Sequence, residues 1–126
     1  MKLHLVALPH TRVSQDFCGC AYTAKALKFC KMLGAQHEIF LYVPEGPTVS
    51  GATLVSCETN NERLAIFGED DPNRLPAWPT DSQCQIFNQR VIEALRERVE
   101  PRDVCALSMS RNQPAPRWRL RGAIRL

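Results

Sequence analysis

The sequence lacks any long apolar run, and this absence argues against a helix that spans a membrane. No stretch approaches the ~18 consecutive apolar residues that such a helix needs. The apolar run at the start of the chain is too short for a secretory signal and is ended by Pro9. We therefore expect a cytoplasmic protein with no membrane span.

The glycine-rich motifs of nucleotide-binding loops are also missing. The sequence contains neither Gly-x-Gly-x-x-Gly nor Gly-x-x-x-x-Gly-Lys-Ser/Thr. These are the patterns that let backbone amides approach a pyrophosphate or a triphosphate. The residues therefore give no support for a dinucleotide or a P-loop nucleotide, and they predict no cofactor.

Six cysteines are present, but their spacing does not predict a metal site. Cys18 and Cys20 form the only close pair, and no second pair or nearby histidine completes a tetrahedral zinc site. Because no export signal is present, we expect reduced, mainly structural thiols, with Cys30, Cys57 and Cys105 at apolar positions. A third interpretation, a thiol or metal protein that uses Cys18 and Cys20, requires a bound metal or a depressed thiol pKa.

Acidic residues are absent from the last sixteen positions, which carry five arginines. The net charge of +3 comes from this end, because residues 1–110 have eleven basic and thirteen acidic side chains. The end shows neither a helical nor a strand period, so residues 108–126 predict a basic, disordered tail. Trp118 and the arginines are of types that contact nucleic acid, but the acidic remainder offers no basic groove. Nucleic acid is therefore disfavoured as a partner.

The first forty-odd residues predict a strand, a helix and a second strand. Residues 3–8 form a short apolar run, residues 20–33 place apolar side chains at helical spacing, and residues 38–43 are rich in β-branched and aromatic types. The carboxyl ends of parallel strands share one edge, where open α/β sheets bind ligands. We therefore expect function near residues 9–22 and 43–46.

The rest of the chain predicts further strands and helices. We expect a strand over residues 53–57, a short helix over 58–66 capped by Asn60 or Asn61, a helix over 82–99 and a strand over 104–107. For the longer helix, Thr80, Asp81 and Ser82 all offer capping oxygens, and the Ser82 to Gln85 spacing is typical of a capping box. Residues 1–107 thus predict one α/β domain with a mainly parallel sheet and flanking helices.

Polar side chains follow the first predicted strand. His10 lies just past it, and an imidazole that titrates near neutrality can act as a base or a hydrogen-bond donor. A solvent-exposed loop histidine is the alternative interpretation. Thr11 can form hydrogen bonds with a sugar or a phosphate, although polar residues also merely keep loops soluble.

Three segments share a pattern with a known enzyme family: Leu8-Pro9-His10-Thr11, Cys20-Ala21-Tyr22-Thr23-Ala24-Lys25 and His37-Glu38-Ile39-Phe40-Leu41-Tyr42. They resemble the amino-terminal domain of glycosyltransferases with two Rossmann-like domains, the GT-B arrangement. Phe87-Asn88, Arg102-Asp103 and the strand at Val104 are similar to that domain as well. The resemblance covers residues 1–107 and implies an incomplete Rossmann-like domain.

The resemblance also implies an activity, the transfer of a sugar from a nucleotide-sugar donor to an acceptor in a cleft between two domains. In such enzymes the amino-terminal domain mainly holds the acceptor, and the carboxyl-terminal domain holds most of the nucleotide. His10 is then the candidate catalytic residue. The candidate acceptor-binding residues are Thr11, Tyr22, Thr23, Lys25 and Glu45.

The sequence departs from this family after Leu107. The family continues there into further strands, helices and a second domain, whereas this chain changes to arginines and prolines. The change predicts a truncated or frame-disrupted fragment that lacks the clamp for the diphosphate and is inactive alone. The main alternative is a small non-catalytic α/β binding or interaction module that engages a partner through its strand edges or its tail.

Overall fold

A computed structural model describes residues 2–17, 21–68, 80–107 and 123–125 of the chain. Its centre is a sheet with the strand order β3-β2-β1-β4-β5, in which every neighbouring pair is parallel. This arrangement confirms the predicted α/β class with a parallel sheet. The strands are β1 (Lys2–Val6), β2 (Glu38–Pro44), β3 (Thr53–Glu58), β4 (Val104–Leu107) and β5 (Ala123–Arg125).

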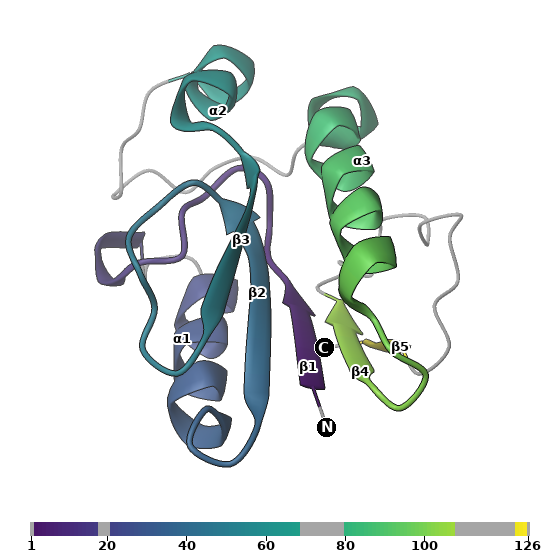
Figure 1. The fold of residues 1–126 in the computed structure, drawn as a ribbon. Coiled ribbons are helices and arrows are strands. Elements are labelled where there is room, and N and C mark those ends of the chain that lie inside the picture. Colours follow the sequence, from purple (N-terminus) through teal and green to yellow (C-terminus); the bar gives the residue numbers. More distant parts are fainter. Residues whose placement is uncertain (1, 18–20, 69–79, 108–122, 126) are drawn as a thin grey trace.

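Helices cover both faces of this sheet. α1 (Ala21–Leu33) follows a short 3-10 helix, η1 (Gln15–Phe17), and α3 (Asp81–Arg98) packs on the opposite face. The remaining helix, α2 (Asn60–Phe67), lies beyond the arrowheads of β2 and β3 in Figure 1. Among the described helices, none is both long enough and apolar enough to cross a membrane.

Each face of the sheet has its own apolar core, because successive strand residues point to opposite sides. In β2, Leu41 belongs to the core under α1 with Cys30, whereas Tyr42 belongs to the core under α3 with Phe87 and Leu95. All five side chains are at most 1% exposed. The near-continuous apolar sequence of β2 is therefore explained by burial on two faces.

A buried polar network joins β1, β2 and the start of β4. His4 Nε2 lies 2.8 Å from Asp103 Oδ2, and His4 Nδ1 lies 2.8 Å from the Tyr42 hydroxyl. Burial by itself would raise the pKa of Asp103, but hydrogen bonds from the Glu100 amide and the His4 ring hold this pKa below its ordinary value. The network satisfies polar groups that would otherwise be costly to bury beneath α3.

A threonine caps the amino end of both α2 and α3. Thr59 Oγ1 accepts a hydrogen bond from the backbone amide of Glu62, and the Glu62 carboxylate accepts one from the backbone amide of Thr59. Thr80 and Gln83 form the same reciprocal pair at α3. The predicted caps at Asn60 and Asn61 and the capping box from Ser82 to Gln85 are therefore wrong, because the threonine that precedes each helix already satisfies its free amides. Thr80, one of the three capping candidates predicted for the longer helix, is confirmed.

The strand β5 was not predicted from the sequence. Its backbone pairs with β4, with Ala106 opposite Ile124, although residues 108–126 were expected to form a disordered tail. The pairing follows from the free edge of β4, whose backbone groups accept a further strand. For residues 108–122 and 126, which lie outside the described part of the chain, the tail stays a prediction.

Candidate functional site

The candidate site lies at the carboxyl edge of the sheet, where β1 and β4 are neighbours. The chain passes from β1 to β2 through α1 on one face and from β3 to β4 through α3 on the other. The strand order 3-2-1-4-5 is that of doubly wound Rossmann sheets, which bind ligands outside the carboxyl ends of the strands where the winding reverses. Residues that follow β1 are therefore well placed to contact a ligand.

His10 is buried at this edge. The strand pairing continues past β1, since the Ala7 amide donates to the Tyr42 carbonyl at 2.9 Å. The His10 side chain is only 8% exposed, and its ring lies 6.1 Å from the Phe67 ring of α2. Burial lowers the pKa of His10 to about 4, so the imidazole is uncharged at neutral pH. The alternative interpretation, a solvent-exposed loop histidine, is therefore wrong.

The helix α2 covers this edge between β3 and the connection that follows β1. Its cap, Thr59, comes directly after Glu58, the last residue of β3, and its last residue, Phe67, packs on His10. A helix of this length spans about 12 Å, and β1 and β3 are about 10 Å apart across two strand spacings. His10 and Glu58 thus lie near opposite ends of α2.

Two contacts attach α2 to α3. The two terminal guanidinium nitrogens of Arg90 donate hydrogen bonds to the two carboxylate oxygens of Glu62, at 2.5 and 2.7 Å. The Gln83 side chain also donates to the Ile66 carbonyl at 3.5 Å. The hydrogen bonds from Arg90 lower the pKa of Glu62 to about 2, so this pair is charged at neutral pH. We call α2, held in this way, the roof of the site.

The predicted acceptor-binding residues divide into a buried group and an exposed group. Thr11 is 5% exposed beside His10, and Thr23 is fully buried, with no hydrogen-bond partner for its hydroxyl among the described residues. Tyr22 is half-buried, and its hydroxyl donates to the Val6 carbonyl at 2.5 Å, which holds the start of α1 against the end of β1. The structure thus brings Tyr22 to the end of β1, with Thr23 next to it in the first turn of α1. The exposed residues are Lys25 and Glu45.

Sequence reasoning missed a buried carboxylate at the same edge. Glu58 is 1% exposed, and its two carboxylate oxygens have no hydrogen-bond partner in the part of the chain that the structure describes. Burial raises the pKa of Glu58 to about 7, and the positive charge of Arg63 opposes this rise. The available signal was that Glu58 directly follows an apolar strand, but the prediction placed it at the start of a helix.

The cysteines that the structure describes are buried free thiols, as predicted for Cys30, Cys57 and Cys105. Burial raises the pKa of Cys30 and of Cys57 to about 11, so both stay un-ionised at neutral pH. Cys18 and Cys20, the basis of the third interpretation, lie outside the described residues. Within the described ranges, no three His, Cys, Asp or Glu side chains gather as a metal site.

Comparisons with protein families, with curated proteins and with solved structures found no match to this chain. The parallel Rossmann-like order, the placement of His10 and the composition of the edge are therefore the observations from which a function can be inferred.

Proposed function

We propose that this chain is the acceptor-side half of a cytoplasmic, GT-B-like glycosyltransferase and binds a sugar acceptor at the carboxyl edge of its sheet. The position of His10 carries this proposal, because this buried, uncharged imidazole follows β1, the strand beside which the winding of the sheet reverses. A neutral imidazole has one nitrogen that accepts a hydrogen bond from a sugar hydroxyl, whereas a protonated one has none.

In the proposed transfer, His10 takes the proton of the acceptor hydroxyl while the hydroxyl oxygen forms a bond to the anomeric carbon of the donor sugar. The bond from that carbon to the nucleoside diphosphate breaks, and the diphosphate leaves with the electron pair. Stabilising this leaving group requires positive groups that face it. The proposal assigns them to a second, nucleotide-binding domain, so this chain is expected to bind acceptor without transferring sugar.

The proposal assigns further residues near the edge to the acceptor. Thr11 and Thr23 are buried hydroxyl side chains, one in the connection that follows β1 and one in the first turn of α1, and the exposed Lys25 and Glu45 are assigned to the outer rim of the site. The donor is a nucleotide sugar that reaches the site from the second domain. A cytoplasmic location is supported by the buried free thiols, since free cysteines are typical of reducing compartments.

Chemical-shift mapping of the isotope-labelled chain tests the proposal. The probes are methyl α-glucopyranoside and methyl α-mannopyranoside at millimolar concentration, where weak sugar binding is visible. We expect shifts in residues 7–11 and in α2, and their loss in His10→Ala. His37→Ala is the matched control, because His37 lies at the amino end of β2 and should leave the shifts unchanged.

Two outcomes would contradict parts of this proposal. A folded chain that shows no sugar-dependent shift, or equal shifts in His10→Ala, would favour the non-catalytic binding module. Release of nucleoside diphosphate from UDP-glucose or GDP-mannose in the presence of these acceptors would show that the chain transfers sugar alone. Such turnover would overturn the assignment of the diphosphate clamp to another domain.

A further inference from the structure

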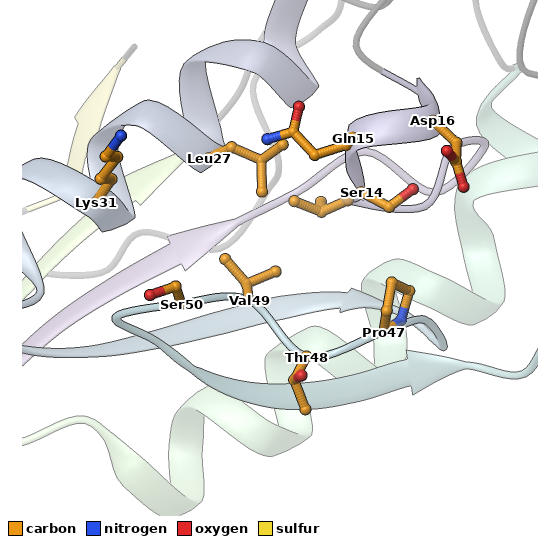
Figure 2. Close-up of a pocket in the computed structure, with 10 residues that line it drawn as sticks. Ser14, Gln15, Asp16, Leu27, Lys31, Pro47, Thr48, Val49 and Ser50 are labelled. Carbon is orange, nitrogen blue, oxygen red and sulfur yellow. The ribbon is translucent and has the colours of Figure 1, made fainter.

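A separate cavity opens on the α1 face of the sheet, and His10 is not among its lining residues. Its volume is about 520 Å³, and its walls come from residues 13–16, from Leu27 and Lys31 of α1, and from residues 47–50 between β2 and β3. Small-molecule sites commonly have volumes of about 300–1,000 Å³. Figure 2 shows the cavity between these three segments.

The inner surface of the cavity is apolar and belongs to the core. Val13 and Val49 are 3% and 7% exposed, and Leu27 packs against the same core. Figure 2 shows Leu27 and Val49 pointing toward one another from α1 and from the β2–β3 connection. Because core packing holds these three side chains, the apolar surface is in place before any ligand arrives.

The rim of the cavity is polar with balanced charge. Gln15, Thr48 and Ser50 are exposed and contribute an amide and two hydroxyls, while Asp16 and Lys31 contribute one charge of each sign. In Figure 2 the Gln15 amide points toward Leu27. Phosphate and carboxylate ligands are usually held by clustered positive groups, whereas this rim has a single lysine, and Figure 2 shows the carboxylate of Asp16 at the other end of the cavity. The lining therefore favours an uncharged ligand with one apolar face and several hydroxyl groups.

Close backbone contact fixes the wall that carries Val49 and Ser50. A Cβ at Gly34, which follows α1, would lie 2.5 Å from the Gly51 carbonyl oxygen, so the two backbones meet without a side chain between them. Gly51 has φ +86, a left-handed conformation that favours glycine. The Ala52 amide also donates to the Val49 carbonyl at 3.3 Å. A wall ordered in this way loses little further entropy on binding.

We infer that this cavity is a second sugar-binding subsite, which holds one neutral pyranose ring between Leu27 and Val49 with its hydroxyls at Gln15 and Ser50. The choice of a sugar as ligand rests on the proposed function. Residues 7–11 approach the carboxyl edge, and residues 13–16 of the same connection form a wall of the cavity. Because both positions belong to one connection of the chain, the inference assigns one unit of an oligosaccharide acceptor to His10 and another to the cavity.

The same shift mapping tests this subsite with two further variants. Methyl α-glucopyranoside should shift the amides of residues 13–16, of Leu27 and Lys31, and of residues 48–50. Leu27→Trp, which fills the cavity, should abolish these shifts, and Gln15→Ala should weaken the apparent affinity several-fold. Gln36→Ala is the matched control, because Gln36 is exposed like Gln15 but does not line the cavity. Inorganic phosphate should cause no shift at these positions.

The results distinguish this inference from the proposed function. Shifts that respond to His10→Ala but not to Leu27→Trp would overturn the subsite and leave the acceptor site at the edge standing. Shifts that respond to Leu27→Trp alone would support the subsite and contradict the role of His10. Equal effects of Gln15→Ala and Gln36→Ala, or phosphate shifts at the cavity, would overturn the subsite. Because Gln15 is exposed, its variant should fold even if Leu27→Trp does not.

Discussion

Two buried groups at the site should give the folding stability of this protein opposing pH dependences. Burial raises the pKa of Glu58 from 4.5 to about 7 and lowers the pKa of His10 from 6.5 to about 4. Glu58 is 1% and His10 8% exposed, so solvent screens neither strongly. A pKa difference of one unit equals about 1.4 kcal/mol, so each group changes the free energy of unfolding by about 3 kcal/mol.

The signs of the two effects follow from which state binds the proton more tightly. Folded Glu58 binds it more tightly, so its stabilising contribution is complete below pH 4.5 and is lost as the pH rises to about 7. Folded His10 binds it more weakly, so its contribution is complete above pH 6.5 and is lost as the pH falls to about 4. The two changes oppose each other in overlapping ranges, so their sum should change little between pH 4.5 and 6.5.

Single substitutions should separate the two effects. In Glu58→Gln the histidine acts alone, and the free energy of unfolding should rise by about 3 kcal/mol between pH 4 and 6.5. In His10→Gln the carboxylate acts alone, and the free energy of unfolding should fall by about 3 kcal/mol between pH 4.5 and 7. Urea unfolding followed by far-ultraviolet circular dichroism across this range measures both, and the double variant is the control that should remove both slopes. Single-variant profiles that run parallel to the wild-type profile would refute the assignment of these slopes to Glu58 and His10.

Further predictions concern the elements that hold the site. Tyr42→Phe removes the hydroxyl that lies against His4 Nδ1 and should lower the free energy of unfolding by about 1–3 kcal/mol in urea; an unchanged value would show that the network does not stabilise the fold. Gly34→Ala should lower it by about 1–3 kcal/mol, because its Cβ would meet the Gly51 backbone. The matched Gly46→Ala, whose Cβ would have no neighbour nearer than 3.6 Å, should change it by no more than about 0.5 kcal/mol, so equal losses would contradict the close-contact account. Arg90→Ala should reduce the hydrogen-exchange protection of α2 but not of α1, since it removes the partner of Glu62; unaltered protection would show that this ion pair does not hold the roof.

Regular apolar spacing made several elements predictable. The predicted helix over residues 20–33 agrees with α1, and the predicted strand over 104–107 agrees with β4. The start of α2 was not predictable in the same way, because Thr59, Asn60 and Asn61 are all good caps. The hydrogen bonds between Thr59 and Glu62 show which of the three is the cap. Because the helix starts after Thr59, Glu58 belongs to β3.

By itself, the sequence determined the alternation of strands and helices in residues 1–107, and therefore the parallel sheet and the position of His10 beyond its first strand. These features follow from local period and chain order, which a sequence displays directly. Only the tertiary structure decided that Phe67 covers His10, that Glu58 is buried and that Leu27 faces Val49 across a cavity. Such contacts join segments far apart in the chain, and burial, which sets both pKa values, depends on those segments meeting.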